Sequence, residues 1–311
     1  MSWRTVVITS RCKLDLSMGY LEVRTEETKK IHLSEIHTLI VESTAVSLTA
    51  GLLCELANRK IKVIFCDERR NPQTELTPYN GTVDTPAKIR QQMRWTVSAK
   101  EQVWQRIVVE KIRNQQKLLI KTGNGACAER LGGYAEQVSY GDITNREGAA
   151  ARLYFSGLFG GDFYRGGSDG LNAALNYGYT ILLSCFNREI VAAGYITQLG
   201  IFHDNMFNAF NLGCDLMEPF RPLVDELVYA LRPEQLEKEE KHKLIGLMNH
   251  QVLVDGNRHY LTTAIRLYTR SVLEALNQGD PSEIRFWTEP PNKKKLKTEA
   301  VTPTAQEEKP T

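Results

Sequence analysis

The sequence predicts an α+β protein in which a small β-rich domain precedes a larger all-α domain. Up to about residue 80, the apolar residues come in short β-branched runs separated by polar turns, a pattern typical of strands. From Lys88 to about residue 277, helix formers dominate and β-type runs are few. The length of 311 residues suits two unequal domains, each large enough to bury a core.

The N-terminal domain is expected over residues 1–78. Its predicted strands lie in the segments TVVITS, YLEVRT, HTLIVES and IKVIFCD. One helical segment, LTAGLLCELANRK at 48–60, follows Ser47, which is a suitable N-cap residue. The segment after the last strand contains three prolines and has no apolar period, so we expect a linker at 79–87.

The helical domain is expected over 88–280, and it begins with one long helix at 88–121. That helix carries nine Lys or Arg residues against two Glu residues, and it contains Trp95 and Trp104. A basic helix with interleaved aromatic residues can contact the phosphates of a nucleic acid. The alternative is a solvated basic face with both tryptophans in the core.

The last segment, 281–311, is rich in Pro, Lys, Glu and Thr and has few apolar residues besides Trp287. Such a composition cannot repay the entropy of folding, so we expect a disordered tail. The lysines within 293–297 either hold DNA loosely or are simply solvated.

Charge and cysteine usage narrow the classes of protein. The 39 basic and 37 acidic residues nearly cancel, so bulk charge neither supports nor excludes binding to nucleic acid. The six cysteines form no CxxC pair, and we expect reduced thiols in a cytoplasmic protein. The N-terminus lacks a signal-peptide pattern, and no segment approaches the roughly 20 apolar residues that span a bilayer, so we expect no membrane association.

Ionisable residues in otherwise apolar surroundings mark the candidate active site. Metal-assisted phosphoryl chemistry needs oxygen ligands, often with a histidine, around a divalent ion. Glu147 lies beside small alanines in NREGAAARLYF, and His203 ends a loop that follows a long helix expected at 171–194. Asp215 and Glu218 are three residues apart in DLMEPFRP, so on a helix both carboxylates would face one site.

Each of these residues also has a purely structural interpretation. A histidine in such a loop is often held by hydrogen bonds without binding a metal. Asp215 and Glu218 would serve as caps of the helix that the two following prolines predict. Arg221, a candidate phosphate clamp beside these acids, would instead form a salt bridge with Asp225, four residues later.

Four motifs taken in order, NREGAAARLYF, LNAALNYGYTILLS, AAGYITQLGIFH and DLMEPFRPLVD, resemble the Cas1 family of CRISPR-associated integrases, in the form found in type II systems. The resemblance extends to about residue 280. It implies that Glu147, His203 and Glu218 are catalytic residues that bind Mg²⁺ or Mn²⁺, and that Asp215 supports them. Many members have aspartate at the position of Glu218, so the longer side chain here can change the metal geometry.

The resemblance also implies an activity. Members join the 3′-hydroxyl ends of prespacer DNA to the CRISPR repeat by direct transesterification, which is the spacer-acquisition step of antiviral defence. Arg146 and Arg221 lie next to the expected ligands and are candidates for clamping phosphate oxygens. Arg90 and Arg94, on the first helix of the helical domain, are candidates for contacts with the prespacer backbone.

The same resemblance implies partners besides DNA. The chain is expected to form a homodimer, largely through its β-rich domain. Two such dimers are expected to flank a dimer of the small protein Cas2, which gives a heterohexamer. Other type II acquisition proteins are further candidate partners.

Two other functions are compatible with parts of the sequence. The adjacent His203 and Asp204 form the pair typical of HD phosphohydrolases, but that class needs an upstream histidine in a helical domain, and His32 and His37 lie in the β-rich part. A non-catalytic DNA-binding scaffold of the same fold is the second alternative, and the three intact ligand positions argue against it.

Overall fold

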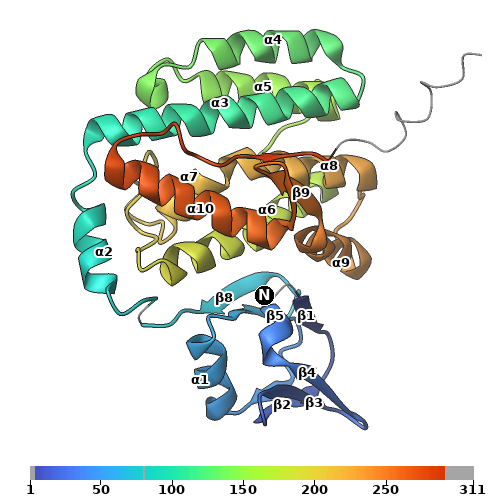
Figure 1. Cartoon of the computed structure of the whole chain (residues 1–311). Coiled ribbons are helices and arrows are strands. Elements are labelled where there is room, and N and C mark those ends of the chain that lie inside the picture. The colour runs from blue at the N-terminus through green and yellow to red at the C-terminus, as the bar shows by residue number, and fades with distance from the viewer. Residues whose placement is uncertain (1–3, 80, 291–311) are drawn as a thin grey trace, which may run out of the picture.

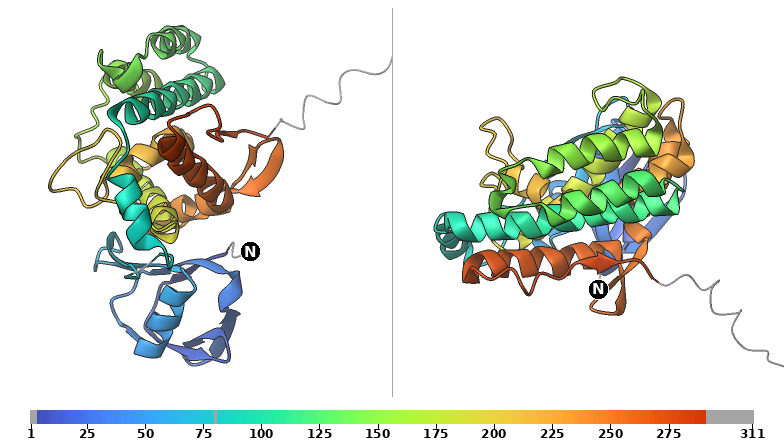
Figure 2. Two further views of the ribbon diagram at one scale, coloured as in Figure 1. Left: turned by 60° about the vertical axis from the view of Figure 1, so that its left-hand side comes forward. Right: turned by 90° about the horizontal axis from the view of Figure 1, so that it is seen from above.

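The computed structural model describes residues 4–79 and 81–290 (Figure 1). The fold class predicted from the sequence is confirmed, because strands come first and a mostly helical region follows. The sheets and helix α1 form one body at one end of the molecule, and the helices form the other body (Figures 1 and 2).

Two four-stranded sheets make up the N-terminal region, in the orders β1-β5-β7-β8 and β4-β3-β2-β6. The first sheet is parallel except for β8, and the second is antiparallel except for β6. The strands are Arg4–Ile8 (β1), Cys12–Ser17 (β2), Tyr20–Arg24 (β3), Thr28–His32 (β4), Ile36–Val41 (β5), Val46–Leu48 (β6), Lys62–Cys66 (β7) and Pro72–Leu76 (β8). Apolar residues of both sheets, such as Leu14 and Leu39, form a core that they share with helix α1.

Helix α1, Ala50–Asn58, is capped by a different residue from the predicted one. Thr49 is extended, and its side chain accepts a hydrogen bond from the backbone N–H of Leu52 at 3.4 Å. Ser47 instead lies in β6, where it pairs with Lys13 of β2. The predicted N-cap was wrong by two residues because strand pairing, which is not local in sequence, holds Ser47 in the sheet.

The second region is built mainly from helices. They are Thr85–Gln92 (α2), Val97–Lys121 (α3), Gly125–Glu136 (α4), Arg146–Phe159 (α5), Gly170–Ala192 (α6), Asn211–Met217 (α7), Arg221–Leu231 (α8), Lys238–Gly246 (α9) and Leu261–Gln278 (α10). Short 3₁₀ turns cover Leu33–Glu35, Tyr140–Asp142, Glu218–Phe220 and Leu247–Asn249. Helices α3, α4 and α5 lie side by side, and α6 crosses beneath them toward the sheets (Figures 1 and 2).

The predicted single helix at 88–121 is two helices. Helix α2 ends at Gln92, and α3 begins at Val97 with Thr96 as its N-cap. The side chain of Gln92 donates to the carbonyl groups of Ile196 and Leu199 at 2.9 and 3.0 Å, which anchors α2 to the loop after α6.

The break between these helices places a tryptophan in the core. Trp95 stacks on Tyr195 with ring centroids 5.7 Å apart, and its Nε1–H donates to Asn277 Oδ1 at 2.9 Å. Trp104 of α3 is also buried. The core interpretation of both tryptophans therefore holds.

A small sheet in the order β10-β9-β11 lies within the helical region and was not predicted. Its strands are Gln251–Val254 (β9), Asn257–Tyr260 (β10) and Trp287–Thr288 (β11). The expected disordered tail was therefore wrong over 281–290, because β11 pairs with β9 and Trp287 is buried. The rest of that tail, with its lysines at 293–297, lies outside the described residues.

The two regions meet along α6. The guanidinium of Arg188 donates to the carbonyl oxygen of Lys60 at 2.7 Å, and Lys60 Nζ donates back to the carbonyl oxygen of Ala192 at 3.3 Å. The expected linker at 79–87 overlaps the start of α2 and passes close to α6, since a Cβ on Gly81 would come within 1.5 Å of the Val191 carbonyl oxygen. In the described part of the chain, no helix has the length and apolar character needed to cross a membrane.

Candidate functional site

Glu147 is held in the first turn of α5. Asn145 caps this helix, and its side chain accepts from the N–H of Gly148 at 3.0 Å. The buried carboxylate of Asp142 accepts from the backbone N–H groups of Arg146 and Glu147 at 2.8 and 2.9 Å. A carboxylate is favoured near a helix N-terminus, where free N–H groups carry partial positive charge. The backbone that carries Glu147 is therefore held by a double cap.

His203 lies in the loop between α6 and α7, and Asp215 of α7 holds it there. The Asp215 carboxylate is fully buried, and it accepts from the backbone N–H groups of Ile201, Phe202 and His203 at 2.6, 3.1 and 3.1 Å. Its Oδ1 also lies 2.5 Å from His203 Nδ1. Because an ionised carboxylate can only accept, Nδ1 carries a proton, and the lone pair of a neutral ring is on Nε2.

The loop can close over this carboxylate because residue 200 is glycine. A Cβ at Gly200 would lie 2.3 Å from the His203 carbonyl oxygen and 2.7 Å from Asp215 Oδ2. Any side chain there would push the loop off the carboxylate. The rings of Trp104 and Phe202 contact the His203 ring edge to face, so its orientation is fixed from three directions.

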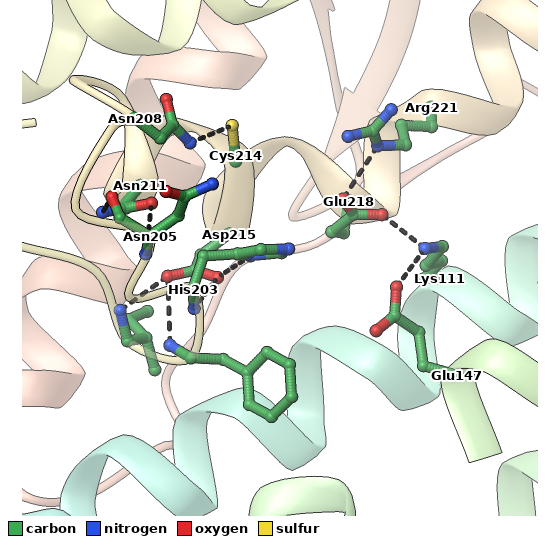
Figure 3. A network of polar contacts seen from close by, with 12 residues as sticks. Lys111, Glu147, His203, Asn205, Asn208, Asn211, Cys214, Asp215, Glu218 and Arg221 are labelled. Carbon is green, nitrogen blue, oxygen red and sulfur yellow. Dashed lines mark hydrogen bonds and ion pairs between the residues drawn. The ribbon is translucent and has the colours of Figure 1, made fainter. Parts of the chain in front are cut away.

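Glu218 begins the 3₁₀ turn between α7 and α8, and its side chain is buried between two cations. Arg221 Nε lies 2.8 Å from Glu218 Oε1. Lys111 of α3 lies with its Nζ 2.5 Å from Glu218 Oε2 and 2.5 Å from Glu147 Oε1. One ammonium thus bridges the two candidate carboxylates, and the ring of His203 lies on the side of Asp215 toward Glu218 (Figure 3).

These contacts set the protonation states of the site. Burial alone would raise the pKa of Glu218, but Arg221 and Lys111 hold it below its ordinary value. Burial alone would lower the pKa of Lys111, but Glu218 and Glu147 raise it above its ordinary value. The hydrogen bond to Asp215 raises the pKa of His203 against the effect of burial, and the nearby glutamates add to the rise. Glu218 is therefore anionic and Lys111 is cationic at neutral pH.

Two predicted roles differ from the observed arrangement. Asp215 does not share an open face with Glu218, because it lies behind His203 and all of its partners are in the loop. Arg221 pairs with Glu218 and stacks over the ring of Tyr179 at 4.5 Å, and it does not pair with Asp225. The alternative of a salt bridge between Arg221 and Asp225 is not formed, because Arg221 pairs with Glu218 and Asp225 accepts from the hydroxyl groups of two tyrosines.

The arginines proposed for DNA lie at different places. The guanidinium of Arg146 lies over the ring of Tyr134, 5.8 Å from its centroid. Arg90 and Arg94 line a cavity of about 570 Å³ between α2 and the end of α10, away from Glu147. Their contacts with DNA stay predictions.

A groove of about 590 Å³ adjoins the candidate site. His203 lines it together with Trp104 and Phe202, and residues of α2, α3 and the 3₁₀ turn at 140–142 complete its walls. It connects the histidine with solvent. Asp204, the second member of the HD pair, is exposed at this groove, and His37 is buried against Glu189 in the other region, so the HD phosphohydrolase arrangement is not assembled.

Lys111 is the residue of this site that the sequence reasoning missed. It was counted only as one of the basic residues of the long helix. A signal was present, because Lys111 lies four residues after Ile107 and three after Val108, both buried, on the apolar face of α3. A lysine in that stripe must be buried, and a buried lysine needs a carboxylate partner.

The donor set fits a divalent cation. Among the described residues, no group of three His, Cys, Asp or Glu side chains is assembled as a metal site. Lys111 Nζ lies between the carboxylates of Glu147 and Glu218, 2.5 Å from an oxygen of each. These two carboxylates are ligands typical of Mg²⁺ or Mn²⁺, and Nε2 of His203 is a nitrogen donor beside them. A histidine whose other nitrogen is held by a buried carboxylate is the usual form of a metal-binding histidine.

Comparisons with known proteins agree on one family. Residues 5–261 match the profile of a family described as CRISPR associated protein Cas1. The chain is 35% identical over 270 residues to the CRISPR-associated endonuclease Cas1 of Neisseria meningitidis serogroup C (strain 8013), which covers 85% of this chain and 88% of the relative. It is 30% identical to a CRISPR-associated endonuclease Cas1 of Francisella tularensis subsp. novicida (strain U112), over 84% of this chain and 89% of the relative.

Solved structures share the fold at low identity. A casposase bound to an integration product matches with a TM-score of 0.72 and 18% identity, over 95% of this chain and 97% of that chain. A CAS1 protein from Thermotoga maritima matches with a TM-score of 0.70 and 17% identity, over 88% and 97% of the two chains. One chain of a Cas6-RT-Cas1–Cas2 complex matches with a TM-score of 0.71 and 19% identity, over 92% of this chain and 36% of that longer chain.

Proposed function

Since the chain belongs to the CRISPR-associated Cas1 family of endonucleases and integrases, we propose that it joins prespacer DNA to the CRISPR repeat by metal-dependent transesterification. The observation that carries this proposal is the convergence of Glu147 and Glu218 on one cation beside a histidine held by a buried carboxylate. Glu147, Glu218 and Nε2 of His203 would hold Mg²⁺ or Mn²⁺. When bound, the ion lowers the pKa of an attacking hydroxyl and offsets charge on the phosphoryl group in the transition state.

The reaction exchanges one phosphodiester bond for another. The 3′-hydroxyl oxygen of the prespacer forms a bond to a phosphorus atom of the repeat, and the bond from that phosphorus to the repeat's 3′ oxygen breaks. The attacking oxygen loses its proton, and the leaving oxygen gains one. Since the hydroxyl is supplied by DNA, no side chain of the protein has to act as a nucleophile.

The side chains of the protein orient the proposed ligands and balance the charge of the reacting phosphate. Asp215 keeps the proton of His203 on Nδ1, which leaves Nε2 free as a ligand. The guanidinium of Arg221 uses its Nε–H on Glu218 and has other N–H groups with which to contact a phosphate oxygen. We assign Arg146 the same clamping role, and Arg90 and Arg94 contacts with the prespacer backbone.

We propose the partners expected for this family. One matching structure is named as a complex with Cas2, which supports a Cas2 partner for this chain. The β2–β3 hairpin exposes Leu16, Met18 and Tyr20, and such a patch fits a homodimer contact of the N-terminal region. The mass of the chain alone and after addition of Cas2, measured by light scattering, distinguishes a dimer from the proposed heterohexamer of two dimers and a Cas2 dimer.

A strand-transfer assay tests the activity. A labelled duplex with 3′-hydroxyl ends and a supercoiled repeat plasmid are incubated with Cas2 and either the wild-type chain or His203→Ala, with Mg²⁺, Mn²⁺ or EDTA. We expect joining with either metal, none with EDTA, and a loss of at least about 100-fold in the variant, because a metal ligand is removed. Asp204→Ala, which removes the adjacent exposed acid, is the matched control.

Two results would contradict the proposal. If joining persists in His203→Ala, the assigned site is wrong. If the wild-type chain binds DNA and never joins it, even with Cas2 and metal present, the chain is a DNA-binding scaffold of the same fold.

A further inference from the structure

Lys111 is an unusual neighbour for a pair of metal-binding carboxylates. Its side chain is 8% exposed, and its Nζ lies 2.5 Å from both Glu147 Oε1 and Glu218 Oε2. It comes from the middle of α3, whereas the two acids come from the start of α5 and from the turn before α8. Three elements that are distant in sequence thus meet at one ammonium group (Figure 3).

Charge balance explains what this lysine does. Glu147 and Glu218 carry two negative charges, and Lys111 and Arg221 carry two positive charges. Two carboxylates forced together without a cation repel strongly when they are buried. A divalent ion that entered beside the ammonium would leave the group with excess positive charge, so the ion and the ammonium compete for the same oxygens.

We propose that Lys111 is a built-in cation that holds Glu147 and Glu218 in place before metal binds and that weakens metal binding by competing with it. This inference rests on the proposed function, because it takes these two glutamates as metal ligands. Lys111 is therefore a positioning residue, since it acts through the two carboxylates. It makes metal binding an exchange of one cation for another within a site that is already assembled.

The sign of one effect separates this role from a merely structural one. Lys111→Met keeps the length and the apolar stem of the side chain and removes the ammonium. If Lys111 only supported the fold, its loss would weaken metal binding along with stability. If it competes with the metal, its loss strengthens Mn²⁺ binding while it destabilises the metal-free protein.

The first test is a titration of the full chain with Mn²⁺, in which electron paramagnetic resonance measures the free ion. The second test is thermal unfolding with and without Mn²⁺. We expect Lys111→Met to bind Mn²⁺ roughly tenfold more tightly than wild type, the size of one pKa unit of interaction between neighbouring charges. Its Tm should be lower than that of wild type without metal, and Mn²⁺ should raise it by more. Lys117→Met is the matched control, because Lys117 lies on the same helix and its side chain is 54% exposed.

A second variant covers the case in which Lys111→Met does not fold. Lys111→Gln removes the charge and keeps an N–H donor for one carboxylate, and it should also bind Mn²⁺ more tightly than wild type. One outcome is that both Lys111 variants bind Mn²⁺ no more tightly than wild type, while Glu147→Gln abolishes the binding seen in wild type. That outcome would overturn the role of Lys111 but would leave the proposed metal site intact. Absence of Mn²⁺ binding in the wild type and in every variant would overturn the metal site itself, and the competition with it.

Discussion

The carboxylate of Asp215 shows how much a single residue does in this protein. It is fully buried, and three consecutive backbone N–H groups and the ring of His203 converge on it. Its charge is thereby compensated by hydrogen bonds, which is the condition for burying an anion. The loop that carries His203 therefore depends on this one carboxylate for three of its backbone hydrogen bonds.

We expect Asp215→Asn to damage both the loop and the site. The NH₂ of the asparagine side chain would face backbone N–H donors, and it cannot accept a hydrogen bond from them. The free energy of unfolding should therefore fall by about 1–3 kcal/mol. Mn²⁺ affinity should fall by roughly 10- to 100-fold, since a residue that orients the proposed ligand His203 is altered. Urea denaturation and calorimetric titration measure the two effects.

The matched control is Asp204→Asn at an exposed acid, which should leave both the stability and the Mn²⁺ affinity unaltered. An unchanged Mn²⁺ affinity in Asp215→Asn would show that His203 does not depend on this contact.

A second buried acid should make stability depend on pH. Asp225 accepts from the hydroxyl groups of Tyr154 and Tyr179, and burial raises its pKa to about 6 although both hydrogen bonds oppose the rise. Because the folded pKa exceeds the unfolded pKa, the stabilisation from this group is complete below about pH 4 and is lost as the pH rises through 6.

The measurement is the free energy of unfolding of wild type minus that of Asp225→Asn, from urea titrations between pH 4 and 7. This difference should fall by about 3 kcal/mol across that range, which is the equivalent of about two pKa units. Asp162→Asn, which alters an exposed acid in the same way, is the matched control. A difference that stays flat would mean that Asp225 is ionised throughout.

Among the helices, the break between α2 and α3 matters most for the candidate site. Helix propensity alone favours a continuous helix there, because the segment contains no proline or glycine between Lys88 and Lys121. Thr96 and the buried Trp95 end that continuity, since the threonine side chain accepts from the N–H of Ala99 at 3.1 Å. The new axis of α3 brings Lys111 to the two glutamates.

Thr96→Ala should lower the free energy of unfolding by about 1 kcal/mol, because it leaves a helix N–H without its side-chain acceptor. Ser98→Ala, two residues later on the exposed first turn, removes a hydroxyl that does not cap the helix. Its effect should stay within about 0.5 kcal/mol. Equal losses in the two variants, measured by thermal or urea unfolding, would argue against the capping role of Thr96.

At the scale of the whole molecule, the C-terminal strand supports the candidate site. Trp287 is buried beside Phe220, and its Nε1–H donates to the carbonyl oxygen of Pro219 at 3.1 Å. The same carbonyl accepts from Asn114 of α3 at 3.0 Å. The turn that carries Glu218 is thus held between the middle of α3 and the end of the described chain.

Trp287→Ala should lower the free energy of unfolding by about 3–5 kcal/mol through the cavity that it leaves. It should also weaken Mn²⁺ binding, because the turn of Glu218 loses its support. Trp287→Phe keeps most of the buried ring and loses one hydrogen bond, so its cost should be nearer 1 kcal/mol. Chemical denaturation and Mn²⁺ titration of both variants decide this, and a tolerated Trp287→Ala would show that β11 is not part of the core.

Features that depend on local pattern and on motifs could be predicted from the amino-acid sequence. The alternation of β-branched runs and the helical period predict the two regions, and the ends of α6 were predicted within two residues. The motifs around Glu147, His203 and Glu218 indicated the family. These features can be predicted because propensity and periodicity depend on residues that are neighbours in the chain.

The pairing of the charged side chains could not be predicted in this way and is seen in the folded structure. The bridge from Lys111 to both glutamates, the place of Asp215 behind His203, and the burial of Trp287 each join elements that are far apart in the chain. The composition of 281–311 predicts disorder, but Trp287 lies in β11, which pairs with β9. Such pairings depend on how helices and sheets pack, and packing is a property of the whole chain rather than of any segment.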